Sequence, residues 1–151
     1  MIDIAVIDYG MGNLHSVAKA LERAAPELKV VVTGDPAQVA RASRVVFPGQ
    51  GAMPDCMREM DAHGLREAVL AAARSKPFLG ICIGLQMLFE RSEEGDVAGL
   101  GLQRGRVRRF SNSMVNAAGA RVKVPHMGWN RIRQAAAHPL WRGIPDGSWF
   151  Y

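Results

Sequence analysis

Cys82 stands between two glycines, in a segment whose pattern changes from strand to helix. Residues 76–81 form a short apolar run, and residues 84–92 space their apolar side chains along one face of a helix. The stretch Gly80-Ile81-Cys82-Ile83-Gly84 fits the pattern G-x-nucleophile-x-G, in which a sharp strand-to-helix turn exposes the nucleophile. Such a turn presents the thiol at the carboxyl end of the strand, where the following helix favours the thiolate and the amide of Ile83 can donate to an oxyanion. The pattern predicts a cysteine nucleophile, and a thiol that only packs between strand and helix is the alternative.

A second glycine-rich turn, Gly49-Gln50-Gly51, follows the strand expected to begin at Arg44. Glycines at a strand end let backbone amides turn toward a ligand. The carboxyl ends of parallel strands meet at one sheet edge, so this turn can lie beside Cys82 and supply the second oxyanion donor. An ordinary glycine turn before a helix is the alternative.

Apolar strands alternate with helices over the first 92 residues, which predicts an α/β fold with a mostly parallel sheet covered on both faces. The expected strands are residues 2–10, 28–34, 44–51 and 76–81, and the expected helices are residues 13–24, 35–42, 53–75 with a break at His63-Gly64, and 84–92. Shorter, more antiparallel pieces follow residue 92. Residues 145–151 are interpreted as a turn and the start of a further strand of the sheet.

Composition excludes several classes of protein. The 151 residues are 48% hydrophobic and carry a net charge of +5, and no apolar run reaches the ~20 residues of a membrane helix. The N-terminus lacks the basic region of a signal peptide, and two cysteines do not suggest a disulfide framework, so we expect a cytoplasmic protein in which Cys56 is packed in a helix. The basic residues do not alternate with aromatic ones, which argues against nucleic acid, and no cluster has the spacing of metal ligands.

Four ordered motifs, DYGMGNL, FPGQGAM, LGICIGLQMLFE and VPHMGWN, resemble those of class I (triad) glutamine amidotransferases. The last motif is similar to that of the glutaminase subunits of imidazole glycerol phosphate synthases. The resemblance covers essentially the whole chain. It implies a flavodoxin-like three-layer fold, with residues 1–151 as a single amidotransferase domain that lacks its last strands.

The resemblance also implies a reaction and a partner. Such subunits hydrolyse L-glutamine to glutamate and ammonia through a cysteine thioester, without a cofactor or a metal, and pass the ammonia to a cyclase subunit of a heterodimer. The resemblance makes Cys82 the nucleophile and Gly49, Gln50 and Gly51 the oxyanion strand, whose peptide reorients when the partner binds its substrate. Gln50, Gly51 and the Ile83 amide beside Cys82 are therefore the expected oxyanion hole. It assigns substrate binding to Gly49, Gly51 and Gln86, and the partner interface to Asn13, His126, Met127, Gly128, Trp129 and Asn130.

Two departures from the family pattern bear on activity. Family members more often carry a small apolar residue at the position of Gln50. The family completes its site with a His-x-Glu segment near the C-terminus, which none of the four histidines provides, since His138 is followed by Pro139 and Leu140. A cysteine without a base and an orienting carboxylate is a weak catalyst, so we predict little or no glutaminase activity for these 151 residues. A different class I amidotransferase, or a non-catalytic subunit that only docks on the cyclase, is the alternative.

Overall fold

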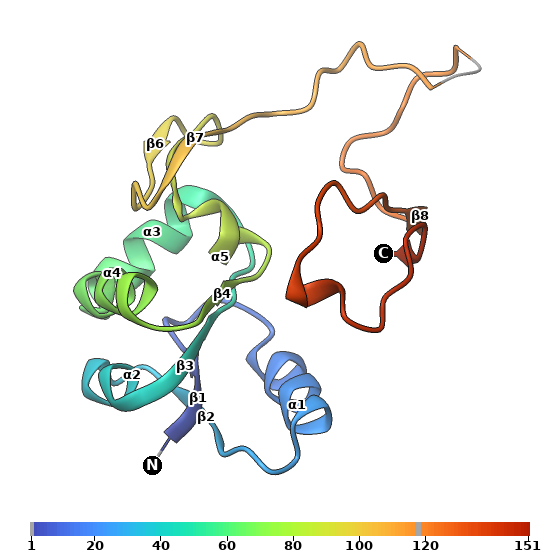
Figure 1. Cartoon of the computed structure of the whole chain (residues 1–151). Helices are drawn as coiled ribbons and strands as arrows, with labels where there is room; N and C mark the ends of the chain where they lie inside the picture. Colours follow the sequence, from blue (N-terminus) through green and yellow to red (C-terminus); the bar gives the residue numbers. More distant parts are fainter. Residues whose placement is uncertain (1, 117–118) are drawn as a thin grey trace. The chain divides into compact units, whose positions relative to one another are not determined.

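Four parallel strands of one sheet end at the same edge, where the sequence places the nucleophile. They pair in the order β2-β1-β3-β4 (Figure 1). Their bounds are Ile2–Ile7 (β1), Val30–Thr33 (β2), Ala42–Phe47 (β3) and Phe78–Gly80 (β4). In the β3–β4 register Phe47 lies opposite Gly80, so the loops that follow these strands begin side by side. The predicted parallel sheet is confirmed.

The computed structural model describes residues 2–116 and 119–151 of the chain. It divides into two compact units, Met1–Arg109 and Phe110–Tyr151. The sheet and all five α-helices of the described residues belong to the first unit.

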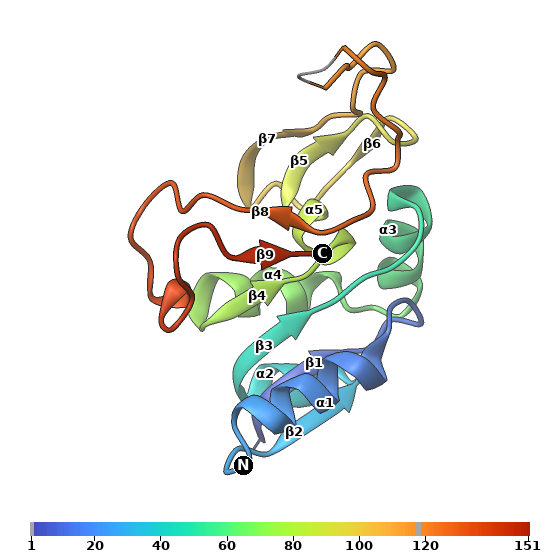
Figure 2. The same ribbon diagram turned by 90° about the vertical axis from the view of Figure 1, so that its right-hand side faces the viewer.

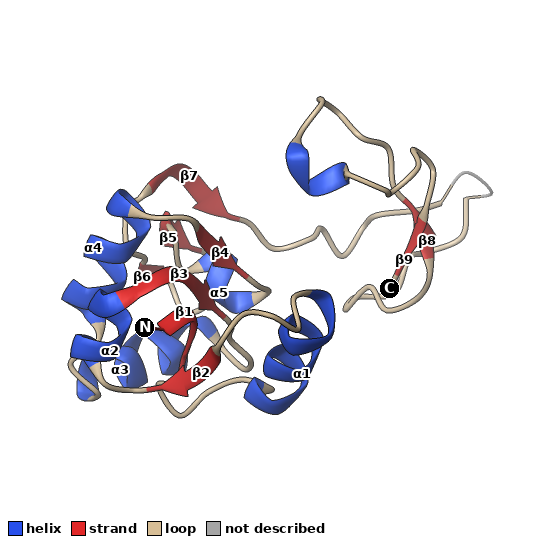
Figure 3. Cartoon of the chain, turned by 60° about the horizontal axis from the view of Figure 1, so that its bottom comes forward, coloured by secondary structure: helices blue, strands red, loops and turns tan. Residues whose placement is uncertain are grey.

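Helices cover both faces of the sheet, which gives three layers (Figures 1 and 3). Strand side chains alternate between faces, so Ile4 and Val6 point to one side and Ala5 and Ile7 to the other. On the first side Ile4 and Val6 pack with apolar residues of one helix, and on the second side Ala5 and Ile7 join the main core with residues of several helices. These elements are α1 (Leu14–Ala24) on the first side, and α2 (Pro36–Arg41), α3 (Met53–Ala62) and α4 (Arg66–Ser75) on the second.

The sequence correctly predicted where α2 begins and where α3 gives way to α4. The Asp35 carboxylate accepts a hydrogen bond from the Ala37 amide at 2.8 Å, and Pro36 occupies the first position of α2. The predicted break at His63-Gly64 separates α3 from α4, with Gly64 at φ 65°.

The helix predicted over residues 84–92 is wrong after its first turn. α5 spans only Ile83–Gln86, and Phe89–Ser92 forms β5. β5 pairs in parallel with β7 (Gln103–Val107) and antiparallel with β6 (Val97–Ala98), in a small sheet near α3 and α5 (Figure 2).

Competition for carbonyl groups ends α5 early. In a continuing helix the carbonyls of Met87 and Leu88 would accept amides four residues later. Instead the Met87 carbonyl accepts the Leu100 amide at 2.7 Å, and the Leu88 carbonyl accepts those of Leu102 and Gln103 at 2.9 and 2.8 Å. A returning chain segment thus replaces the helical hydrogen bonds, and periodicity alone could not predict it.

The second unit contains one short antiparallel ribbon. Asn130–Arg131 (β8) pairs with Trp149–Phe150 (β9), and Pro139–Trp141 (η1) forms a 3₁₀ turn between them. The strand expected after residue 148 exists, but its partner is β8 rather than a strand of the central sheet. The amide of Ile132 donates to the Ser148 carbonyl at 3.1 Å, and that of Gly147 donates to the Ile132 carbonyl at 3.0 Å. These two bonds extend the pairing beyond β8 and β9 within the second unit.

Candidate active site

Cys82 occupies the strained turn that its flanking glycines predict. It lies between β4 and α5 with φ 57° and ψ −119°, a conformation that costs a non-glycine residue about 1–3 kcal/mol. The Ile81 amide donates to the Phe47 carbonyl at 3.0 Å and ties the start of the turn to β3. Cys82 is exposed to solvent. A strained and exposed thiol at a sheet edge has the geometry of a nucleophile elbow.

The two glycines of the motif allow this turn to form. A Cβ atom on Gly84 would overlap the carbonyl oxygen of Phe47, and one on Gly80 would lie 2.8 Å from the Cα atom of Leu85. Both obstacles are backbone, which cannot move aside as a flexible side chain can. The glycines therefore let α5 start directly against β3 and β4.

The loop after β3 lies beside the Cys82 turn. A Cβ atom on Gly49 would lie 2.9 Å from the backbone nitrogen of Gly84 and 3.2 Å from the Cβ atom of Ile83. Gly51 has φ 103°, a conformation that favours glycine. The tertiary structure thus brings the two predicted loops together, while the roles of their residues in catalysis remain predictions.

The predicted oxyanion donors have amides that can bind a ligand. Among the residues that the structure describes, none accepts a hydrogen bond from the backbone amides of Gln50, Gly51 or Ile83. Gln86, the predicted substrate-binding residue, is half-buried, and its backbone amide donates to the Cys82 carbonyl at 3.2 Å. It therefore stands one helical turn beyond Cys82.

Sequence reasoning missed two side chains beneath this loop. The Tyr9 hydroxyl donates to the Pro48 carbonyl at 3.0 Å, and the Cys56 thiol donates to the Gln50 carbonyl at 3.4 Å. Both side chains are fully buried, and burial raises the pKa of Tyr9 and the pKa of the Cys56 thiol. The expected packing of Cys56 in a helix is confirmed, but the thiol also has a polar partner. A buried cysteine six residues after a glycine turn was the only available signal for it.

The residues predicted to face a partner lie in different parts of the chain. Asn13 is exposed in the first unit, where its side-chain oxygen accepts the Ser16 amide at 3.2 Å and caps α1. The segment from His126 to Asn130 belongs to the second unit. There Met127 and Trp129 are exposed, at 73% and 67%, which leaves large apolar side chains in contact with water.

The histidines are divided between the two units, and neither His15 nor His63 of the first unit is hydrogen-bonded to Cys82. In the first unit His15 is exposed on α1, and Nδ1 of His63 contacts the Glu59 carbonyl at 2.8 Å. In the second unit Nε2 of His126 contacts Asn130 Nδ2 at 2.6 Å, and Nδ1 of His138 accepts the Leu140 amide at 3.2 Å. The part of the first unit that the structure describes thus offers Cys82 no hydrogen-bonded histidine.

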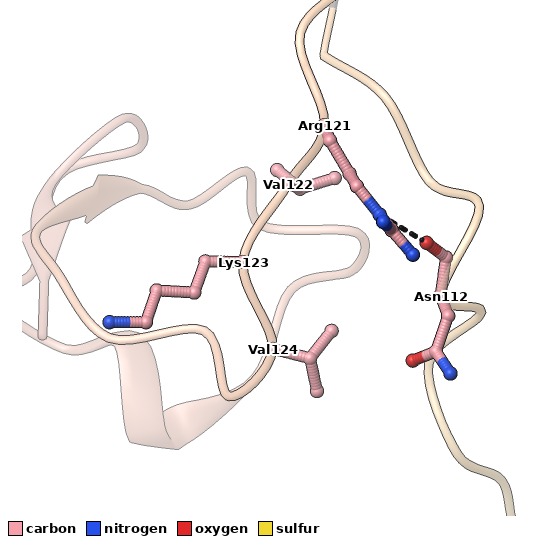
Figure 4. A pocket seen from close by; sticks show the side chains of 5 residues that line it. All are labelled: Asn112, Arg121, Val122, Lys123 and Val124. Carbon is pink, nitrogen blue, oxygen red and sulfur yellow. Dashed lines mark hydrogen bonds between the residues drawn. The ribbon is translucent and has the colours of Figure 1, made fainter.

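A pocket of about 370 Å³ lies in the second unit. Figure 4 shows its lining, where Nε of Arg121 donates to the Asn112 carbonyl at 2.9 Å. The other lining residues are Val122, Lys123 and Val124, and none of the predicted site residues lines it.

Within residues 2–116 and 119–151, no group of three or more histidine, cysteine or carboxylate side chains could hold a metal, and no helix has the length and apolarity to cross a bilayer.

The different exposure of the two thiols predicts selective alkylation. Iodoacetamide should label Cys82 at least about tenfold faster than Cys56 in the folded chain, because a buried, protonated thiol is inert. Mass spectrometry of tryptic peptides after timed labelling measures both rates. In urea the two rates should converge. Faster labelling of Cys56 in the folded chain would contradict the placement of both residues.

Comparison with known proteins identifies relatives along the whole chain. The profile of the family described as glutamine amidotransferase class-I matches residues 5–147. A protein of Aromatoleum aromaticum named imidazole glycerol phosphate synthase subunit HisH is 67% identical over 152 aligned residues, which are 100% of this chain and 72% of that protein. The protein of the same name from Thiobacillus denitrificans is 64% identical over 99% of this chain and 66% of its own length. The chain thus spans about two thirds to three quarters of these relatives.

A solved structure supports the fold. A protein of Listeria monocytogenes described as a peptidase E aligns with 68% of this chain and 63% of its own, with a TM-score of 0.54 and 14% sequence identity. At this identity the match concerns the fold and carries no information on the reaction.

Proposed function

This chain belongs to the class-I glutamine amidotransferase family, and we propose that it is the glutaminase part of an imidazole glycerol phosphate synthase, which acts in histidine biosynthesis. One observation carries the chemical part of the proposal. Cys82 stands in a strained, exposed turn whose next residues contact the Gly49–Gly51 loop. The names of the relatives that match the whole chain support the biosynthetic assignment.

The proposed reaction uses the two loops together. The Cys82 thiolate attacks the side-chain carboxamide carbon of L-glutamine, and the amide oxygen becomes an oxyanion that accepts hydrogen bonds from two of the amides of Gln50, Gly51 and Ile83. Collapse of this intermediate breaks the C–N bond, the leaving group takes a proton to depart as ammonia, and a thioester remains. Water then hydrolyses the thioester to glutamate and restores the thiol. Gly49, Gly51 and Gln86 hold the substrate in this proposal.

The proton steps need a group that these 151 residues lack. The amide nitrogen must gain a proton to depart as ammonia, and the attacking water must lose one. A histidine oriented by a carboxylate performs both transfers in such sites. No His-x-Glu segment occurs in the sequence. We therefore propose that residues 1–151 form one amidotransferase domain without a complete catalytic set, and that this chain alone has little or no glutaminase activity.

The proposed partner is the cyclase subunit, which receives the ammonia in a heterodimer of the cytoplasm. The proposed partner contacts are Asn13 in the first unit and, in the second unit, His126, Gly128 and Asn130 with the exposed Met127 and Trp129. Burial of large apolar side chains and depletion of charge are typical of the centre of such an interface. Neither a cofactor nor a metal takes part in the proposed reaction.

Association with the cyclase tests this proposal. We expect the chain to co-elute with a purified cyclase subunit in size-exclusion chromatography, and Trp129→Ala to weaken the complex roughly 10- to 100-fold, as loss of an interface tryptophan does. Leu140→Ala is a matched control, since Leu140 is 63% exposed in the same unit but outside the proposed surface. Binding to the synthase subunit of another amidotransferase, with none to the cyclase, would select the first alternative. Binding without labelling of Cys82 by the chloromethyl ketone analogue of glutamine would select the docking subunit.

A further inference from the structure

We propose that the Tyr9 hydroxyl and the Cys56 thiol are positioning residues that hold the two carbonyls flanking the Gly49–Gln50 peptide, so that this peptide alone turns to present the Gln50 amide to the oxyanion. The inference rests on the proposed function, because it takes the loop beside Cys82 as the oxyanion loop. It adds two residues that lie under the loop and do not touch the substrate.

The two contacts hold alternate carbonyls, one on each side of the Gly49–Gln50 peptide. Tyr9, after β1, donates to the Pro48 carbonyl at 3.0 Å, and Cys56, in α3, donates to the Gln50 carbonyl at 3.4 Å. Tyr9 and Cys56 are 0% exposed, whereas Gln50 is exposed, so both donors lie on the interior side of the loop. A Cβ atom on Gly49 would lie 2.5 Å from the Tyr9 hydroxyl, which shows how closely the phenol supports the chain.

Because peptides are planar, these contacts also fix the directions in which the amides of Gly49 and Gly51 point. In a trans peptide the carbonyl and the N–H point in opposite directions. The carbonyls of Pro48 and Gln50 point to the interior donors, so the amides of Gly49 and Gly51 point away from them. The outer two peptides are thereby held by buried hydrogen bonds.

The Gly49–Gln50 peptide, which lies between them, is not held by hydrogen bonds to buried side chains. Within the described part of the chain, neither the Gly49 carbonyl nor the Gln50 amide makes a hydrogen bond. Turning this peptide changes mainly ψ of Gly49 and φ of Gln50, and Gly49 has no side chain to hinder the rotation. With the flanking peptides held, the rotation need not displace Gly51 or the Cys82 turn.

Burial keeps both donors protonated and away from competing water. It raises the pKa of Tyr9 and the pKa of Cys56, so each remains a hydrogen-bond donor at neutral pH. Removal of either donor leaves a loop carbonyl without its partner and allows the whole loop to move.

NMR of the 151-residue chain tests the geometric part directly. Cys56→Ala should shift the Gln50 carbonyl ¹³C and the Gly51 amide ¹⁵N resonances and add microsecond-to-millisecond exchange at Gly51. Tyr9→Phe should act in the same way on Pro48 and Gly49. Met60→Leu is the matched control, because Met60 is equally buried in α3 one turn beyond Cys56. Loop shifts no larger than those of Met60→Leu, in variants whose β1 resonances are unchanged, would overturn the proposal.

A ratio of two alkylation rates tests the positioning role. The chloromethyl ketone analogue of glutamine has a carbonyl that an oxyanion hole activates, whereas iodoacetamide reports only on the Cys82 thiol. Cys56→Ala and Tyr9→Phe should lower the chloroketone-to-iodoacetamide rate ratio roughly fivefold each, the effect of one hydrogen bond, without changing the iodoacetamide rate. An unchanged ratio would refute the positioning role. Wild-type chain that shows no protection of Cys82 by glutamine would refute the proposed function instead, and the NMR outcome would still decide the loop contacts.

Discussion

The 151-residue chain, supplied with glutamine and a purified cyclase subunit, is expected to release ammonia at least roughly a thousandfold more slowly than a longer relative. Loss of one member of a nucleophile–base pair lowers turnover by about 10⁴- to 10⁶-fold. Cys82 has the turn and the neighbouring loop, but the sequence has no His-x-Glu segment to supply a base and its orienting carboxylate. A coupled glutamate dehydrogenase assay measures the glutamate-linked rate, and ammonia is measured separately.

Two variants make this result interpretable. Cys82→Ala sets the background, which the unmodified chain should exceed only slightly. A chimera in which the C-terminal segment of a longer relative is joined to residue 151 should regain most of the activity if the missing base is the cause. Ammonia release by the unmodified chain within tenfold of the longer relative would refute the prediction.

Gly84→Ala is expected to destabilise the first unit by about 3 kcal/mol, at the upper end of the cost of overpacking. The new methyl group would overlap the carbonyl oxygen of Phe47, which also accepts the Ile81 amide at 3.0 Å. The obstacle is the backbone of the central strand β3, so relief of the overlap must move the sheet or displace α5. Urea unfolding followed by circular dichroism measures the loss.

A second glycine separates this steric effect from the general cost of an alanine. Gly64 has φ 65° and no heavy atom within 4 Å of an added Cβ, so Gly64→Ala should cost only about 1 kcal/mol for its left-handed conformation. Iodoacetamide should also label Cys82 at a changed rate in Gly84→Ala but not in Gly64→Ala. Equal destabilisation by the two substitutions would show that the contact with Phe47 does not control this turn.

The order of the elements and the nucleophile turn follow from local chemistry. Alternation of apolar strands with helices predicted the parallel sheet, and Asp35 with Pro36 marked the start of α2. The glycines around Cys82 predicted its turn, although the obstacle that Gly84 avoids is the distant Phe47 carbonyl of β3. The alternation and the helix start can be derived from the sequence because their causes lie within a few positions of each other.

Other features depended on contacts between distant segments. α5 stops after Gln86 because carbonyls of Met87 and Leu88 accept amides from residues 100–103. Periodicity over residues 84–92 carries no information about that competing segment.

The hydrogen bonds beneath the Gly49–Gly51 loop were decided in the same way. Tyr9 and Pro48 are 39 positions apart, and their hydrogen bond forms because β1 and β3 are adjacent in the sheet. Cys56 is close to Gln50 in sequence, but only the packing of α3 directs its thiol to the loop. Residue types and spacing therefore predicted the strained turn at Cys82, whereas tertiary packing decided which buried groups donate hydrogen bonds to the neighbouring loop.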